Sequence, residues 1–396
     1  MQDLLFLAHR IPYPPNKGDK IRSWSILKHL AERWRVHLGC FVDYPEDWQH
    51  TAFLEGLCAS ARFAPLPMLK ARARSLAGLG RGDALSVACY RDAAMREWVR
   101  DTIARVRPRA AFLYSSQTGV FLDELSGLRT VMDLVDVDSD KWAQYAQARR
   151  GPMRWLYERE ARTLARFEAE VAGKVDACLL VSEPEAALFR QKAPHAARKT
   201  FALTSSVDTE RFSPERSYPD PYPPGGPVIA FTGAMDYWPN VDAVVWFARD
   251  ILPLVRERVD GARFFIVGFK PTPEVRALAE LPGVTVTGPI DDTRDYIAHA
   301  NCIAAPLRVA RGIQNKVLEA MALEKPVVAS TQAAQGIPGM APEELAVAAT
   351  ADGIADAVVA VLTGRGGPDG KAARRRVLAN YGWEANLKVL DRVLEP

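Results

Sequence analysis

Cysteine and histidine are scarce in this chain of 396 residues, and their positions exclude several kinds of site. The five cysteines lie far apart, with no C-x-x-C pair and no spacing typical of metal ligands. We therefore expect small buried thiols in a reducing compartment, without disulfides. No H-E-x-x-H motif or other cluster of metal ligands is present. The sequence predicts neither a disulfide framework nor a metal centre.

Two glycine motifs that bind phosphates are also missing. No G-x-G-x-x-G follows the first apolar run of either half of the chain. The Gly370-Lys371 pair has no glycine five residues before Gly370 and no Ser or Thr after the lysine, so it is not a P-loop. The sequence supports neither a nicotinamide dehydrogenase nor a P-loop nucleotide hydrolase.

Long hydrophobic runs are absent as well. The N-terminal apolar run, Leu4–Ala8, follows Asp3 and is too short for a signal peptide or a membrane span, and no later segment is long enough. We therefore expect a cytoplasmic protein.

Charge is nearly balanced, since the net charge is +3, which gives no argument for nucleic acid. The segment Arg62–Arg109 is an exception, with eleven Lys or Arg against four Asp or Glu, including Lys70, Arg72, Arg74 and Arg81. A solvated surface and a peripheral contact with the anionic inner face of the cytoplasmic membrane both fit this pattern.

Short apolar runs alternate with helical patterns along the whole chain, which predicts an α/β protein with mostly parallel sheets. The segment 213–227 holds six prolines and two glycines in fifteen residues, which predicts a linker. We expect one α/β domain at 1–212, this linker, a second α/β domain at 228–380, and a last helical segment at 381–396. The expected strands are 4–8, 36–42, 110–114, 130–135, 177–181, 228–231, 262–267, 284–287, 301–305, 327–330 and 345–348. The expected helices are 20–33, 93–106, 141–173 with a break near Gly151-Pro152, 184–192, 240–258, 273–281, 293–299, 313–323, 353–363, 371–379 and 384–394.

The most informative segment is Pro306–Ser330, PLRVARGIQNKVLEAMALEKPVVAS. An apolar run leads into a basic turn with a glycine, a helix follows with Lys316 and Glu319 one turn apart, and a second apolar run ends the segment. Backbone N–H groups at a helix start, with cations beside them, suit a diphosphate. A carboxylate further along the helix can accept hydrogen bonds from ribose hydroxyls. The alternative is a solvated helix start with an i,i+3 ion pair.

The sequence segments on either side of these charges resemble a known family. LEAMA followed by PVVAS is similar to the donor-site motif of family 4 glycosyltransferases. Three further segments resemble parts of the same family: SSVDTERFSP (205–214), FTGAMDYWPN (231–240) and YGWEANLKVL (381–390). Three segments resemble, within that family, the sugar transferases of PEP-CTERM/exosortase exopolysaccharide systems: RIPYPPNKGDKIRSW (10–24), DLVDVDSDKW (133–142) and ARGIQNKVLEAMA (310–322).

The resemblance implies a GT-B fold, with two Rossmann-like domains whose parallel sheets face each other across a cleft. The domain at 1–212 would bind the acceptor and the domain at 228–380 the nucleotide-sugar, and the closing helix at 381–396 would pack back towards the first domain. It implies retaining transfer of a hexose or N-acetylhexosamine from a nucleotide diphosphate sugar, probably UDP-linked, to a polysaccharide or lipid-linked oligosaccharide in exopolysaccharide biosynthesis. The donor is a substrate, and neither a cofactor nor a metal is expected. The candidate donor-binding residues are Gly18, Gly233, Gly268, Lys270, Arg308, Gly312, Ile313, Gln314, Lys316 and Glu319.

Two departures from the family pattern bear on the donor site. Relatives usually carry a second glutamate eight positions before the one at the ribose, and here that position is Arg311. Relatives also place cations after the first strand of the second domain, whereas the segment after Gly233 has none before Asn240, which we expect to cap the next helix. The positive charge for the diphosphate must then come chiefly from the Arg308–Lys316 segment.

Polar residues at the ends of the first domain's strands are candidates for the acceptor. Neighbouring carboxylates after the strand 130–135 can raise one pKa towards neutrality, which suits a proton acceptor, although Asp138 or Ser139 can equally cap a helix. The candidate catalytic residues are Asp136, Asp138, Arg311 and Lys316. The candidate acceptor-binding residues are His9, Asn16, Lys17, Lys20, Ser115 and Ser116, of which the two lysines can equally serve a donor phosphate.

Two other functions stay open at this point. A sugar-nucleotide epimerase on the same fold would need no acceptor and would isomerise the donor. A non-catalytic protein that binds a nucleotide-sugar would perform no chemistry, and the missing first glutamate keeps that alternative open.

Overall fold

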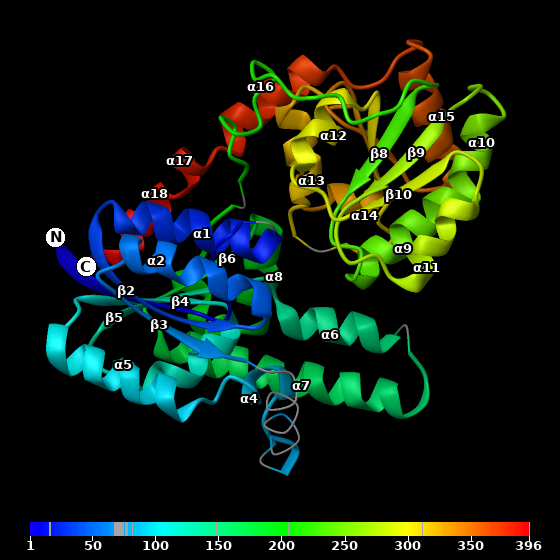
Figure 1. The fold of residues 1–396 in the computed structure, drawn as a ribbon. Helices are drawn as coiled ribbons and strands as arrows, with labels where there is room; N and C mark the ends of the chain where they lie inside the picture. Colours follow the sequence, from blue (N-terminus) through cyan, green and yellow to red (C-terminus); the bar gives the residue numbers. More distant parts are fainter. Residues whose placement is uncertain are drawn as a thin grey trace. The chain divides into compact units, whose positions relative to one another are not determined.

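The apolar runs of the sequence form the strands of two parallel sheets in the computed structural model (Figure 1). The structure describes residues 1–15, 17–66, 75, 78–80, 82–147, 149–204, 206–310 and 312–395. The chain divides into two units. Unit 1 consists of Met1–Thr204 and Leu387–Pro396, and unit 2 consists of Ser205–Asn386. The α/β prediction is confirmed.

Unit 1 contains a seven-stranded sheet within its described residues, in the order β3-β2-β1-β4-β5-β6-β7, and every neighbouring pair is parallel. Its strands are β1 Gln2–Ala8, β2 Trp34–Val42, β3 Ser60–Pro65, β4 Ala110–Tyr114, β5 Arg129–Val135, β6 Ala177–Leu180 and β7 Thr200–Ala202. Its α-helices are α1 Gly18–Ala31, α2 Thr51–Leu57, α4 Leu85–Ala88, α5 Ala93–Val106, α6 Asp138–Gln147, α7 Gly151–Lys174, α8 Glu183–Lys192 and α18 Lys388–Leu394. Three 3₁₀ helices also lie among the described residues of unit 1, namely η1 Pro45–His50, η2 Ser116–Leu125 and η3 Pro194–Lys199.

Helices cover both faces of this sheet, with α1 on one side and α5 on the other (Figure 1). The arrangement explains why the central strands are continuous apolar runs, since a strand buried on both faces needs no polar alternation. All five residues of β4 are buried, for example. The core on one face joins Leu5 and Leu7 of β1 to Met95 and Val99 of α5.

Unit 2 contains a six-stranded parallel sheet in its described residues, in the order β10-β9-β8-β11-β12-β13. Its strands are β8 Val228–Thr232, β9 Arg263–Val267, β10 Val284–Gly288, β11 Cys302–Ala305, β12 Val327–Ser330 and β13 Ala346–Ala348. Its α-helices are α9 Trp238–Trp246, α10 Leu252–Arg256, α11 Pro273–Ala277, α12 Thr293–His299, α13 Asn315–Ala322, α14 Thr331–Ala334, α15 Ala351–Leu362, α16 Gly370–Asn380 and α17 Trp383–Asn386. A π-helix, η4 Phe247–Ile251, and a 3₁₀ helix, η5 Leu278–Glu280, complete the unit.

Most expected elements are present, and the differences have local causes. The break near Gly151-Pro152 is confirmed, because α6 ends at Gln147 and α7 begins at Gly151. The helix expected over 240–258 is present as a continuous helical stretch over 238–256, in which α9 passes through the π-helix η4 into α10. The closing helix is split into α17 and α18. The strands β3 and β7 and the helix α2 were not expected from the sequence.

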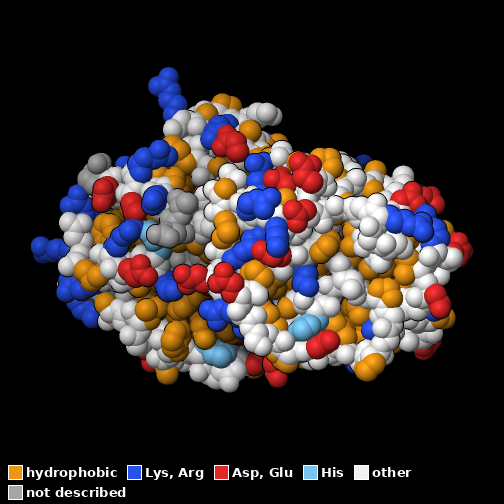
Figure 2. All heavy atoms as spheres, turned by 90° about the horizontal axis from the view of Figure 1, so that it is seen from above, with side chains coloured by type: hydrophobic (Ala, Val, Ile, Leu, Met, Phe, Trp, Pro, Cys, Tyr) orange, Lys and Arg blue, Asp and Glu red, His pale blue; other side chains and the backbone are white. Residues whose placement is uncertain are grey.

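The Pro-rich segment 213–227 forms neither helix nor strand, as its composition predicts, and it lies within unit 2. Arg263 holds part of it, because its guanidinium donates to the backbone oxygens of Pro223 and Gly226. Among the described residues, no helix is long and apolar enough to cross a membrane. Basic and acidic side chains are intermingled over the face shown in Figure 2, in keeping with the nearly balanced composition. The four basic residues at 70, 72, 74 and 81 lie outside the described residues.

Candidate functional site

The strand order of unit 2 points to one edge of its sheet. The strands β8 and β11 are neighbours, but the chain leaves β8 towards β9 on one side and leaves β11 towards β12 on the other. In open parallel sheets, ligands bind beyond the carboxyl ends of the strands at such a switch point. The loop that begins at Gly233 follows β8, and the segment 306–314 follows β11. The predicted donor residues on these two segments therefore lie where a parallel sheet ordinarily holds its ligand.

Lys316, in the first turn of α13, is directed towards the segment after β8. Its ammonium donates to Asn240 Oδ1 at 3.0 Å and lies 4.8 Å from the centre of the Phe231 ring. Asn240 is buried, and its amide donates in turn to the backbone oxygen of Ala234 at 3.0 Å. Burial lowers the pKa of Lys316 to about 8, against the opposite effect of Glu319. A lysine held in this way is a partly buried cation at the switch point.

The expected capping role of Asn240 is wrong. The helix α9 begins two residues earlier, at Trp238, with Tyr237 as its N-cap. Pro239 fits the first turn, where its missing N–H costs no hydrogen bond. The side chain of Asn240 is thereby free of the helix end and orients Lys316.

Glu319 lies one turn further along α13. Burial raises its pKa to about 7, although Lys316 and Arg211 act in the opposite direction. Lys316 and Glu319, both within the described part of the chain, form no ion pair, so the i,i+3 pair considered as the alternative is not present. The carboxylate accepts no hydrogen bond from any described residue. With a pKa of about 7, the Glu319 carboxyl group can either accept or donate a hydrogen bond.

Arg308 follows β11 and forms an ion pair with Asp242. Its guanidinium binds both carboxylate oxygens of Asp242 on α9, with 2.9 Å between Nε and Oδ2, and lies 5.4 Å from the Trp246 ring. The Asp242 carboxylate raises the pKa of Arg308, and 51% of the Arg308 side chain is exposed. Its charge is thus largely compensated in this structure. Arg311, the other expected cation of the turn, lies outside the described residues.

The turn before α13 is shaped by close packing between glycines. Gln314 is the N-cap residue and makes no side-chain capping bond, although its amide lies 3.4 Å from the Gly312 carbonyl oxygen. Gly312 has a φ of +60°, and a Cβ on Gly336 would lie only 2.0 Å from the Gly312 oxygen. The turn before α13, which also contains the buried Ile313, is therefore packed tightly against a second glycine.

Two backbone segments also lie close together at the ends of β8 and β9. The N–H of Gly233 donates to the Val267 carbonyl at 3.0 Å. Gly268 has a φ of +150°, and a Cβ there would lie 1.8 Å from the Gly233 oxygen, so only glycine fits. Lys270 follows with a φ of +53° and an exposed side chain. The structure thus brings Gly233, Gly268 and Lys316 to the same edge of the unit 2 sheet.

In unit 1 the switch point lies between β1 and β4. His9, at the end of β1, stacks on Tyr114 with 5.7 Å between ring centres, and its Nε2 lies 3.7 Å from the Asp19 carboxylate. Ser115 has a φ of +73°, an uncommon conformation for a residue with a side chain. The Ser116 hydroxyl is buried and has no hydrogen-bond partner among the residues that the structure describes. Strain and unmet polar groups cluster at functional sites, so these three residues remain candidates for the acceptor.

The lysines of the first loop have different surroundings. Lys17 donates to the Tyr44 hydroxyl at 2.9 Å and lies over that ring, just before Gly18 opens α1. Lys20 is 2% exposed, and its ammonium is 2.7 Å from Asp47 in a buried ion pair. That contact occupies the Lys20 ammonium in the interior of the unit. Asn16 lies outside the described residues.

The aspartates after β5 divide into two groups. Asp133 is fully buried and accepts two hydrogen bonds from Arg22, so it stabilises the interior of unit 1. Asp136 and Asp138 lie beyond Val135, whose φ of +70° and shifted register turn the chain out of the sheet. Asp138 is the first residue of α6 and lies 3.7 Å from Lys141. Asp136 and Asp138 thus stand together at the carboxyl edge of the unit 1 sheet.

Three residues and one contact of these surroundings were not expected from the sequence. The residues are Asp242, which binds Arg308, and the buried glutamates Glu168 and Glu185 beside the aspartates. The contact is that of Asn240 with Lys316. Each acts through a contact between segments far apart in the chain. In the described ranges, no group of three or more His, Cys, Asp or Glu residues could hold a metal ion.

Known proteins share the fold of this chain and a family model matches part of it. Residues 226–364 match the family model described as glycosyl transferases group 1. No curated protein matches the chain. Among solved structures, sucrose-phosphate synthase from Thermosynechococcus elongatus has a TM-score of 0.72 at 17% identity, covering 99% of this chain and 98% of that chain.

Two further structures extend the comparison. Anabaena HepE in complex with UDP and glucose has a TM-score of 0.70 at 13% identity, covering 100% of this chain and 99% of that chain. WaaG, a glycosyltransferase involved in lipopolysaccharide biosynthesis, has a TM-score of 0.67 at 15% identity, covering 99% and 100%. The fold is that of GT-B glycosyltransferases.

Proposed function

We propose that this protein is a retaining glycosyltransferase of the family 4 kind. It would move a hexose or N-acetylhexosamine from a UDP-linked donor to a polysaccharide or lipid-linked oligosaccharide in exopolysaccharide biosynthesis. The group 1 glycosyltransferase match over residues 226–364 supports the reaction class. The choice of UDP draws support from HepE, whose structures hold UDP and UDP-glucose.

The placement of Lys316 carries the proposal. A partly buried ammonium at the switch point, beside the start of an eight-residue helix, is suited to an anion. In a sugar transfer, negative charge grows on the departing diphosphate, and preorganised donors in a partly buried site stabilise it. The Lys316 ammonium and the backbone N–H groups at 312–314 would meet the phosphates. Glu319 would accept hydrogen bonds from the ribose.

The acceptor side rests on unit 1. Asp136 or Asp138 would orient the acceptor hydroxyl or take its proton, because a carboxylate within hydrogen-bond reach of a hydroxyl raises its nucleophilicity. His9, Ser115 and Ser116 would contribute polar contacts to the acceptor. We further propose that the cations of unit 2 replace a metal ion at the diphosphate.

Product analysis on one purified donor tests the proposed function. The protein is incubated with UDP-glucose or UDP-N-acetylglucosamine, with and without EDTA, and UDP and sugar products are quantified. We expect UDP release that EDTA leaves unchanged, through slow hydrolysis without an acceptor and faster release with one. An isomerised UDP-sugar would indicate an epimerase, and an unaltered donor that still binds would indicate a binding protein. Either result would refute the proposed transfer.

A further inference from the structure

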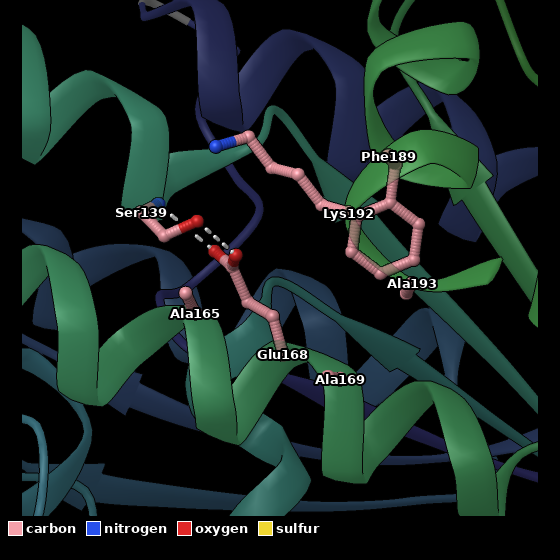
Figure 3. Close-up of a pocket in the computed structure, with 7 residues that line it drawn as sticks. All are labelled: Ser139, Ala165, Glu168, Ala169, Phe189, Lys192 and Ala193. Atoms are coloured by element: carbon pink, nitrogen blue, oxygen red, sulfur yellow. Dashed lines mark hydrogen bonds between the residues drawn. The ribbon is translucent and has the colours of Figure 1, made fainter. Parts of the chain in front are cut away.

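Two buried glutamates from different helices hold the first turn of α6. Glu168, on α7, accepts hydrogen bonds from the Ser139 backbone N–H at 3.1 Å and from the Ser139 hydroxyl at 2.6 Å (Figure 3). Glu185, on α8, accepts from the backbone N–H of Val137 at 3.0 Å. Both side chains are buried, with Glu168 only 2% exposed. The main chain on either side of Asp138 is therefore fixed by a carboxyl group.

The surroundings of Glu168 leave it little freedom. It borders a cavity of about 170 Å³ that is lined by Ser139, Ala165, Glu168, Ala169, Phe189, Lys192 and Ala193. In Figure 3 its carboxyl group points at Ser139, and the Lys192 chain passes on the opposite side of the cavity. The Lys192 ammonium is 2.9 Å from Asp140, also on α6. Lys192 on α8 thus adds a third contact to the first turn of α6.

We propose that Glu168 and Glu185 are positioning residues for Asp136 and Asp138, an inference that rests on the proposed function. The chain leaves β5 through Val135, whose left-handed conformation is unfavourable for a β-branched residue. Such a turn persists only when its surroundings hold it in place. The two carboxyl groups bind the residues on both sides of Asp138, at 137 and 139. They thereby fix where the two aspartate carboxylates lie relative to an acceptor.

The protonation state of Glu168 shows which substitution preserves the contact. Burial raises its pKa to about 8, with Asp138 acting in the same direction and Ser139 and Lys192 opposing it. Burial also raises the pKa of Glu185. The nearby carboxylates of Asp136 and Asp138 raise it as well, whereas Lys141 lowers it. Near neutral pH, Glu168 is therefore mostly a neutral acid. Glutamine reproduces its shape and its hydrogen-bonding capacity.

The same helix offers a matched control. Glu160, eight residues earlier on α7 and also 2% exposed, accepts from the backbone N–H groups of Leu85 and Ser86 and from the Ser86 hydroxyl. It therefore makes the same kind of contact to the start of another helix, α4. Removal of Glu160 costs a buried carboxyl group and its hydrogen bonds without touching the α6 turn.

The test compares Glu168→Ala, Glu168→Gln, Glu185→Ala and Glu160→Ala in the full chain by UDP release from UDP-glucose. We expect the kcat of Glu168→Ala and Glu185→Ala to fall about tenfold or more, because misplacement by about 1 Å is costly in catalysis. The donor KM should stay within about twofold, since the donor residues other than Gly18 lie in unit 2. Glu168→Gln should retain kcat within about threefold, and so should Glu160→Ala.

Hydrogen exchange separates the possible outcomes. The Ser139 amide should exchange faster in Glu168→Ala, and the Leu85 and Ser86 amides in Glu160→Ala. Equal losses of kcat in Glu160→Ala and Glu168→Ala would overturn the positioning role, as would a wild-type kcat in Glu168→Ala. If Glu168→Ala does not fold, Ser139→Ala removes the hydroxyl contact alone and should lower kcat in the same sense. Wild-type protein that releases no UDP would instead refute the proposed function.

Discussion

Burial acts on single ionisable residues at both candidate sites. It lowers the pKa of Lys316 and raises those of Glu319 and Glu168, because removal from water disfavours whichever form is charged. The shifts bring the pKa values of all three groups to about 7 or 8. Their protonation can therefore change within the range in which enzymes work, which is common at functional sites.

A first prediction concerns Glu168 and stability. Its pKa is about 8 in the folded chain against 4.5 in the unfolded one, so the folded state holds the proton more tightly. The stability that this group contributes is complete below pH 4.5 and is lost as the pH rises towards 8. Glu168→Gln removes that loss. Thermal denaturation should show a Tm advantage of the variant that grows from pH 5 to pH 8 by about 5 °C and then levels off. A difference independent of pH would contradict this assignment.

Close contacts between backbone segments shape the edge of the unit 2 sheet at the level of elements. Gly268, after β9, and Gly288, at the end of β10, both have positive φ, but only Gly268 meets another backbone. The loop that begins at Gly233 can therefore lie directly against the end of β9. This contact brings the two loops of the donor site to the same place.

The second prediction compares alanine at these two glycines. Gly288→Ala should cost about 1–2 kcal/mol for the left-handed backbone alone, because nothing lies within 4 Å of its Cβ. Gly268→Ala should cost about 3 kcal/mol or more, since its Cβ would collide with the Gly233 oxygen. Urea denaturation of both variants measures the difference. Equal free energies of unfolding would show that the close approach is not needed.

Local patterns in the sequence predicted the elements better than the contacts between them. The central strands are continuous apolar runs, and Gly151-Pro152 marks the break before α7. The strand β3 was missed because most of its residues are not buried, and β7 because it has only three residues. The contact of Lys316 with Asn240 joins positions 76 residues apart, and that of Glu168 with Ser139 joins positions 29 apart. No periodicity encodes such pairs.

The whole molecule divides its proposed tasks between two units. The donor residues other than Gly18 belong to unit 2, and the candidate acceptor residues belong to unit 1. Each unit has a parallel sheet with its own switch point, between β8 and β11 or between β1 and β4. The proposed chemistry needs both substrates, whereas nucleotide binding alone should involve mainly unit 2.

The third prediction follows from that division. Hydrogen exchange with and without saturating UDP should show the strongest slowing in unit 2, at residues 312–317 and 231–240. The amides of 137–139 should change little, because UDP lacks an acceptor. Slowing confined to unit 1 would contradict the assignment of the donor to unit 2.

Calorimetric titration of UDP into Lys316→Ala tests the central claim most directly. Lys325→Ala is the matched control, because it removes the same charge beyond the other end of α13. At pH 7 we expect Lys316→Ala to weaken UDP binding about tenfold or more, while Lys325→Ala binds within about twofold of the wild type. Wild-type affinity should also fall as the pH rises above 8, where Lys316 loses its proton, and Lys316→Ala should lack that dependence. Equal affinities of the two variants would contradict the proposal that Lys316 holds the diphosphate.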